Sequence, residues 1–160
     1  MDNSLNLYPL FNKFIIIHAK RQTIRKKIIS TIRQDIHMIE IGLKHTSELT
    51  VSESVTAIQM GSGDMPVLAT PAMMALMENA AMLAVRDELP EGCTTVGGHI
   101  TSSHLKPSKI GDKVIATAEV TKVDGKKIEF KVAAYSGDTL LGEGTHLRFI
   151  VDKEKFMSRL

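Results

Sequence analysis

The 160-residue sequence has little of several features that define particular protein classes. It holds one cysteine, Cys93, which excludes an internal disulfide framework and a metal site built from several thiolates. No apolar run approaches the roughly 20 residues that a membrane-spanning helix needs. With 43% hydrophobic and 24% charged residues, the chain is typical of a globular protein with room for a substantial core. A single cysteine fits a reducing compartment, so we expect a cytoplasmic protein.

Several short motifs that carry chemistry are also missing. The sequence contains no HExxH helix motif, no paired cysteines and no dense cluster of acidic residues, so we expect no metal. It lacks a GxSxG elbow, a Walker loop and a dinucleotide-binding fingerprint, and we expect no cofactor. Cys93 follows a Pro-Glu-Gly turn, and we interpret it as a bystander, not a nucleophile.

Charge is distributed unevenly along the chain. Residues 1–37 hold seven basic and two acidic residues, which leaves 13 basic and 16 acidic residues in 38–160. The first segment can form a basic helix, and three interpretations are open: an arm that contacts DNA or a membrane surface, a targeting peptide, or a peripheral extension upstream of a natural start at Met38. The turn of a DNA-binding helix-turn-helix often contains a glycine, and no glycine precedes Gly42 in this sequence. We therefore do not expect nucleic acid as a partner. We expect a basic, helical N-terminal extension over 1–37 and one domain over 38–160.

The body of the chain predicts an α+β fold. The stretch 47–60 favours one strand or two short ones, and a helix is predicted from Thr70 to about Glu88, where Pro90 stops it. Four strands follow, predicted at 93–107, 112–123, 126–136 and 139–152. The connections "DGK" and "SGD" are tight turns that join antiparallel neighbours. We therefore expect an antiparallel sheet wrapped around one long central helix.

Residues 70–85 of the predicted helix read "TPAMMALMENAAMLAV" and carry one charged residue, Glu78. Thr70 is predicted as its N-cap, with Pro71 at the first helical position. An ionised carboxylate in an apolar interior costs several kcal/mol unless it is paired. Glu78 therefore either faces solvent or an interface, or it serves a chemical purpose.

The positions of Thr70 and Glu78 constrain a shared site. They are eight residues apart, about 12 Å along a helix axis, so one small reacting group does not reach both on one helix. Two antiparallel copies of the helix across a two-fold axis would bring Thr70 of one chain near Glu78 of the other. A shared site therefore predicts a homodimer. His104 lies on the strand after the helix, and His99, five residues earlier, falls on the opposite face of an unbroken strand, which disfavours a shared metal.

Three stretches of this sequence resemble a known family. "ATPAMMALMENAA", "TTVGGHITSSHLKPSKIGDKV" and "GEGTHLRFIVDKEKF" are similar to the hotdog-fold thioesterases of the fluoroacetyl-CoA thioesterase-like group. The resemblance covers about 39–160 and leaves 1–37 unexplained. It implies a hotdog fold, hydrolysis of an acyl-CoA to free acid and CoA, and an active site at a homodimer interface. Assembly beyond the dimer is left open.

The resemblance also implies residue roles. Glu78 would activate water as a general base or attack the thioester directly, and His104 would assist proton transfer. Thr70 and the helix N-terminus would hold the thioester carbonyl. Gly97 would let the acyl end approach the backbone, and Arg148 would bind a cofactor phosphate or serve the interface. The fluoroacetate-specific branch carries aromatic residues before the helix; here "GSGDMPVLA" has none, so we expect a different or broader acyl preference.

Two other functional classes compete with hydrolysis. A non-catalytic acyl-CoA-binding regulator with a basic DNA-contacting arm would account for residues 1–37, but it has no need of Glu78 beside a thioester. A hotdog hydratase has an Asp five residues before its catalytic histidine. Thr94 stands at that distance from His99, and His99 from His104, so the hydratase pattern is not met.

Overall fold

The computed structural model describes residue 24 and residues 39–160. The N-terminal extension predicted over 1–37 lies outside the described residues apart from Ile24, and its role stays a prediction.

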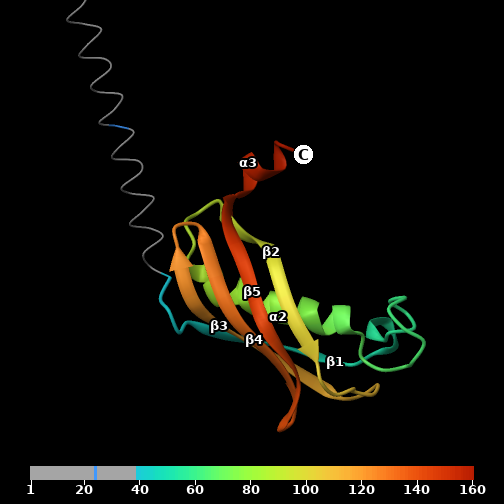
Figure 1. Ribbon diagram of the computed structural model, residues 1–160. Helices are drawn as coiled ribbons and strands as arrows, with labels where there is room; N and C mark the ends of the chain where they lie inside the picture. Colours follow the sequence, from blue (N-terminus) through green and yellow to red (C-terminus); the bar gives the residue numbers. More distant parts are fainter. Residues whose placement is uncertain (1–23, 25–38) are drawn as a thin grey trace, which may run out of the picture. The chain divides into compact units, whose positions relative to one another are not determined.

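Five strands form one antiparallel sheet in the order β1-β3-β4-β5-β2. They are β1 (Lys44–Thr50), β2 (Cys93–His104), β3 (Lys113–Asp124), β4 (Lys127–Ser136) and β5 (Thr139–Asp152). The sheet curls around α2 (Thr70–Val85), the one long helix among the described residues (Figure 1). Gly125 and Gly137, both at positive φ, turn β3 into β4 and β4 into β5, as the two predicted tight turns required.

Helix α2 (Thr70–Val85) continues into a short 3₁₀ turn, η2 (Arg86–Glu88), close to the predicted end. The prediction of Thr70 as N-cap was wrong. The cap position belongs to Ala69, which offers no side-chain hydrogen bond, and Thr70 is the first helical residue. The reason is a tertiary contact, because the Thr70 hydroxyl hydrogen-bonds to His104 and does not turn back onto its own helix.

The core lies between α2 and the concave face of the sheet. Met73, Met77, Ala80 and Ala81 are fully buried on the helix. The strands supply alternating inward side chains, which are Val114, Ala116, Ala118 and Val120 on β3 and Ile128, Phe130 and Val132 on β4. Small alanines on both surfaces let the helix and sheet approach closely, and Ser47 of β1 donates to Asn79 Oδ1 at 2.7 Å.

One stripe of α2 is not covered by the sheet. Pro71, Ala75 and Asn79 are exposed, and Glu78 and Met82 are half-buried. These positions recur every three or four residues and therefore lie on one face of the helix. The sequence-based expectation of a helix buried on most sides thus holds for the rest of its surface, and Glu78 belongs to the open stripe.

Strand β2 forms one edge of the sheet and pairs only with β5 among the described residues. Its register shifts between Gly97 and His99, which marks a β-bulge at Gly98. His99 and His104 both follow the bulge, so the predicted placement on opposite faces of the strand is retained.

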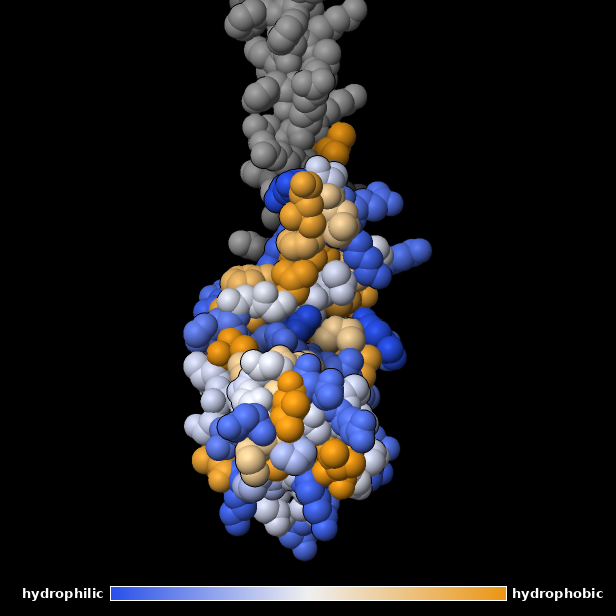
Figure 2. Space-filling view, turned by 90° about the vertical axis from the view of Figure 1, so that its right-hand side faces the viewer, coloured by the Kyte–Doolittle hydropathy of each residue, from blue (hydrophilic) through white to orange (hydrophobic). Residues whose placement is uncertain are grey.

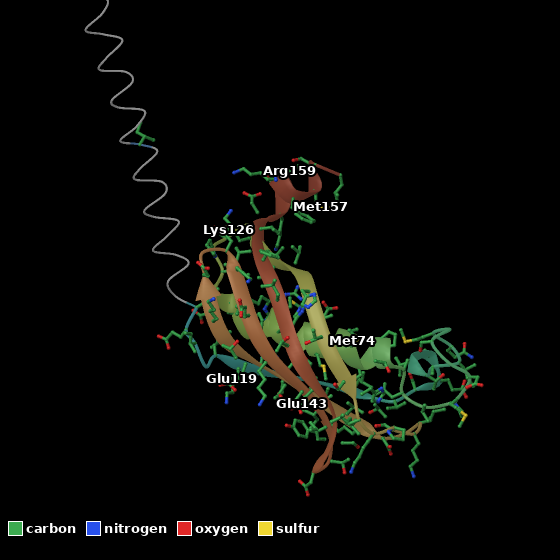
Figure 3. The ribbon with its side chains drawn as sticks, in the orientation of Figure 1. Met74, Glu119, Lys126, Glu143, Met157 and Arg159 are labelled. Atoms are coloured by element: carbon green, nitrogen blue, oxygen red, sulfur yellow. The ribbon has the colours of Figure 1, made fainter. Side chains whose placement is uncertain are left out.

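Residues labelled in Figure 3 mark the two ends of the domain. Met74 lies near the start of α2, whereas Lys126, at the β3–β4 turn, and Met157 and Arg159, in and after the short C-terminal helix α3 (Lys153–Met157), lie at the other end (Figure 3). Figure 2 looks onto the end formed by residues 51–69 and shows apolar side chains separated by hydrophilic ones. No helix among the described residues is long and apolar enough to cross a membrane.

Candidate active site

The first group of predicted site residues lies at the start of α2. The Thr70 hydroxyl and His104 Nδ1 are hydrogen-bonded at 2.8 Å, joining the helix to the end of β2. Both residues line a pocket of about 310 Å³. Its other lining residues are mainly aliphatic and small, and they include Ala57, Val67, Leu68, Leu105 and Pro107.

His104 has a second ring nitrogen without a protein partner. Nε2 is buried and makes no hydrogen bond within the described part of the chain. A buried polar atom is normally satisfied by protein or water, and an exception needs an explanation. An atom of a bound substrate or of a second subunit would supply such a partner. Thr70 and His104 together therefore offer a hydroxyl and a titratable ring to one pocket.

The second group lies further along α2. Glu78, Gly97 and Arg148 line another pocket, of about 390 Å³, together with the stripe residues Ala75, Asn79 and Met82. The Glu78 side chain is 40% exposed, so its carboxylate is open to a reactant. The sheet supports it from behind through β2 and β5, which pair Gly97 with Arg148.

Gly97 is required by the approach of Glu78 to the sheet. A Cβ atom at this position would lie 2.8 Å from Glu78 Oε1 and 3.3 Å from His146 Cε1. Any side chain would push the carboxylate away from β2. The glycine is therefore explained by the position of Glu78, and its predicted contact with an acyl group stays a prediction.

Arg148 is buried, with 7% of its surface exposed, and its guanidinium points to β2 and not to open solvent. Nε donates to the Thr95 hydroxyl and Nη2 to the Thr95 carbonyl, both at 2.8 Å. Burial lowers the pKa of Arg148, while the neighbouring Glu78 carboxylate raises it. The guanidinium thus places a fixed positive charge behind Glu78.

His146 completes this group, and the sequence-based prediction missed it. Its ring is buried on β5, two residues before Arg148, and Nε2 lies 3.4 Å from Glu78 Oε1. Residues two apart on a strand face the same side, so the stretch "GTHLR" contained the signal. The resemblance drew attention to Arg148 in that stretch and left His146 without a role.

The two groups are separate in one chain. Thr70 and His104 share one pocket, Glu78, Gly97 and Arg148 share the other, and no residue lines both. The eight-residue spacing along α2 keeps them about 12 Å apart. Among the described residues, no cluster of His, Cys, Asp and Glu could hold a metal ion.

Comparison with known proteins places this arrangement in a family. The family model for fluoroacetyl-CoA-specific thioesterases (FlK) matches residues 51–154. The fluoroacetyl-CoA thioesterase of Streptantibioticus cattleyicolor is 34% identical over 94 residues, covering 59% of this chain and 68% of the relative. The chain belongs to the FlK thioesterase family. Both pockets are lined by residues of the matched segment.

Solved structures agree with the FlK assignment. A solved structure of the fluoroacetyl-CoA thioesterase FlK superposes with a TM-score of 0.71 at 29% identity, covering 75% of this chain and 93% of that chain. A thioesterase superfamily member from Thermus thermophilus gives 0.71 at 27% identity, with 76% and 90% covered. A hot-dog-like protein from Thermanaerovibrio acidaminovorans, at 24% identity and a TM-score of 0.70, shares the fold, with 77% and 91% covered. The predictions of a hotdog fold and of a thioester hydrolase are confirmed.

Proposed function

We propose that this protein hydrolyses the thioester bond of an acyl-CoA at a site shared by two subunits, with Glu78 as the essential carboxylate. One observation carries the proposal. Glu78 is the only acidic residue on α2, and it opens into a pocket backed by the buried cation Arg148 and by Gly97, which leaves room for the carboxylate. Together with membership of a thioesterase family, this favours attack on a carbonyl carbon.

A homodimer would unite the two groups of site residues. Glu78 lies on the open stripe of α2, beside Gly97 of β2, and the outer edge of β2 has no partner strand among the described residues. A second copy would cover both the stripe and this edge. With the two α2 helices antiparallel, Thr70 and His104 of one subunit would meet Glu78 of the other. The orphaned Nε2 of His104 would then gain a partner from the substrate or the opposite subunit.

The proposed chemistry follows from this arrangement. Thr70 and the first backbone N–H groups of α2 would hold the thioester oxygen as negative charge develops on it. Glu78 would take a proton from water, whose oxygen bonds to the carbonyl carbon. The carbon–sulfur bond then breaks, and His104 would assist protonation of the departing sulfur. Each turnover consumes one water and releases a carboxylic acid and free CoA.

The acyl group is proposed to differ from fluoroacetate. Segment 57–65 beside the Thr70 pocket contains no aromatic residue, and Ile58, Met60 and Met65 are 48%, 44% and 59% exposed. Nothing aromatic in this segment would close over a two-carbon group. These exposed aliphatic side chains are close in sequence to Ala57 and Ser62, which line the pocket, and they favour a larger aliphatic acyl chain. We further propose a cytoplasmic location, where acyl-CoA is made and used.

The test is release of free thiol from a panel of short, branched, aromatic and long acyl-CoAs. The wild-type protein is compared with Glu78→Gln, which keeps the shape of the side chain and removes its basicity. We expect hydrolysis by the wild type and a loss of kcat of at least about 100-fold in the variant.

Folding of the variant is checked by its circular dichroism spectrum and its size in solution, which should match the wild type. Unchanged hydrolysis by Glu78→Gln would overturn the role of this carboxylate. Acyl-CoA binding without hydrolysis of any substrate would overturn the enzymatic function. It would favour the alternative function, a non-catalytic acyl-CoA-binding regulator.

A further inference from the structure

His146 makes three polar contacts through the two nitrogens of a buried ring. Nδ1 lies 2.8 Å from the His99 carbonyl oxygen of β2. Nε2 lies 3.0 Å from Arg148 Nη1 and 3.4 Å from Glu78 Oε1. Only 2% of the residue is exposed, and the Phe130 ring of β4 packs beside it with a centroid distance of 6.4 Å. The ring therefore lies directly behind the proposed catalytic carboxylate.

These partners fix the tautomer of the ring. A carbonyl oxygen can only accept a hydrogen bond, so Nδ1 carries a proton that it donates to His99. A guanidinium can only donate, so Nε2 must present its lone pair to Arg148. His146 is therefore neutral, protonated on Nδ1 and bare on Nε2, as long as both contacts are made.

The surrounding charges act on this state from three elements. Burial lowers the pKa of His146, and the Arg148 cation on β5 and the His99 side chain on β2 act in the same direction. The hydrogen bond to the His99 carbonyl and the Glu78 carboxylate of α2 oppose them, but the net direction is downward. The contact between His146 and Glu78 is thus not an ion pair at neutral pH. A carboxyl oxygen of Glu78 and the unprotonated ring nitrogen of His146 therefore lie 3.4 Å apart.

We propose that His146 is a positioning residue that accepts a hydrogen bond from Glu78 at the moment when Glu78 has taken a proton from the attacking water. The inference rests on the proposed function and deepens it. The protonated carboxyl group becomes a donor, Oε1–H, and the lone pair of Nε2 lies in reach to accept from it. Nε2 has a single lone pair, so the Oε1–H donor takes the place of Arg148 Nη1, while Arg148 keeps its two hydrogen bonds to Thr95.

One O–H bond of water breaks, its oxygen bonds to the thioester carbon, and the proton goes to Glu78 Oε1, where His146 Nε2 accepts the new hydrogen bond. The carbon–sulfur bond then breaks, and the proton on Glu78 is passed to the departing thiolate. Glu78 returns to its ionised form, and His146 stays neutral throughout.

Two variants of His146 separate its two nitrogens. The amide nitrogen of His146→Asn can replace Nδ1 and donate to the His99 carbonyl, but the side chain has nothing at the place of Nε2. The longer His146→Gln places an amide oxygen near the place of Nε2 and gives up the donor to His99. Both remove the aromatic ring and are similar in polarity, so each serves as the control for the other.

The measurement is kcat/KM for a hydrolysed acyl-CoA across the pH range in which the folded state is retained. In His146→Asn the protonated carboxyl loses its acceptor, so we expect a fall of roughly tenfold or more and a shift of the acidic limb to lower pH by about one unit. In His146→Gln we expect the acidic limb of the kcat/KM profile to stay within a few tenths of a pH unit of its wild-type position. A limb that does not move in His146→Asn, or that moves equally in both variants, would overturn the proposal.

A second measurement on the wild type does not depend on the folding of a variant. The ¹⁵N chemical shifts of the His146 ring at neutral pH should report a neutral ring that is protonated on Nδ1. A ring protonated on Nε2, or a charged ring, would overturn the proposal even if Glu78→Gln is inactive. Conversely, the expected tautomer with active Glu78→Gln would overturn the proposed function and leave the tautomer itself established.

Discussion

At the scale of single residues, the site depends on what stands behind Glu78. Gly97 leaves the space for its carboxylate, Arg148 supplies a buried positive charge, and His146 presents a bare nitrogen. None of the three needs to touch a substrate to affect its turnover. Substitutions behind the carboxylate should therefore separate activity from stability.

Gly97→Ala should impair activity much more than folding. The new Cβ would lie 2.8 Å from Glu78 Oε1, and the flexible carboxylate can move away at little cost to stability. A displaced base loses its alignment with water, so we expect kcat to fall about tenfold or more and the free energy of unfolding to change by less than about 1 kcal/mol. Kinetics and urea unfolding provide the two measurements.

A double variant provides the control for this prediction. In a Glu78→Gln background, Gly97→Ala should cause little further loss, because the carboxylate on which it acts is absent. Independent, multiplicative losses in the double variant would contradict the explanation.

His146 should also make stability depend on pH. Burial holds its pKa in the folded state below the ordinary value of 6.5, so below about pH 6.5 the unfolded chain binds more protons at this residue than the folded protein does. Its contribution is absent above this pH and destabilises the fold increasingly as the pH falls. We expect the free energy of unfolding of the wild type to fall between pH 7.5 and 5.5 by more than that of His146→Gln. Equal falls in urea titrations of the two proteins would contradict this.

At the scale of secondary-structure elements, the pairing of β5 with β2 needs glycines. Gly142 and Gly144 on β5 face β2, and a Cβ on either would collide with backbone atoms of that strand. Met73 of α2 packs against Gly142 as well. These glycines therefore allow the edge strand, with His104 at its end, to lie close to the rest of the sheet.

Gly144→Ala should destabilise the fold. Its Cβ would overlap the Thr101 carbonyl oxygen and lie 2.7 Å from the carbonyl carbon, and backbone atoms in a sheet cannot move aside as a side chain can. We expect a loss of about 1–3 kcal/mol in the free energy of unfolding, measured by urea titration. Gly63→Ala is the matched control, since its Cβ would meet only the Ala57 side chain, at 3.3 Å. Equal stability of the two variants would show that β2 adapts.

At the scale of the whole molecule, the question is whether a complete site needs two subunits. One chain keeps Thr70 and His104 in one pocket and Glu78 in another. If the proposed dimer forms, each of its two sites draws Thr70 from one subunit and Glu78 from the other.

Mixing two inactive variants tests this directly. Thr70→Ala and Glu78→Gln are unfolded together in equal amounts and refolded, so that about half of the dimers carry one chain of each kind. In such a dimer one site has both substitutions and the other has neither. We expect recovery of about a quarter of the wild-type activity. Activity no greater than the sum of the separate variants would contradict a shared site.

The sequence by itself determined much of this protein, because the deciding signals are local. Turn residues, strand alternation and an uninterrupted apolar helix predicted α2 and strands β2 to β5 almost to their ends, and the stretches around Glu78 and His104 indicated the family. The strand region predicted over 47–60 was wrong for 51–60, because β1 is Lys44–Thr50 and a 3₁₀ turn, Glu53–Val55, follows it. Tertiary structure decided the rest. The Thr70 hydroxyl hydrogen-bonds to His104 and does not cap its own helix. The contact of His146 with Glu78 exists only because β5 packs behind α2. Thr70 and His104 are 34 positions apart in the sequence, and Glu78 and His146 are 68 apart. Contacts at such separations depend on how the sheet curls, and no local sequence pattern encodes them.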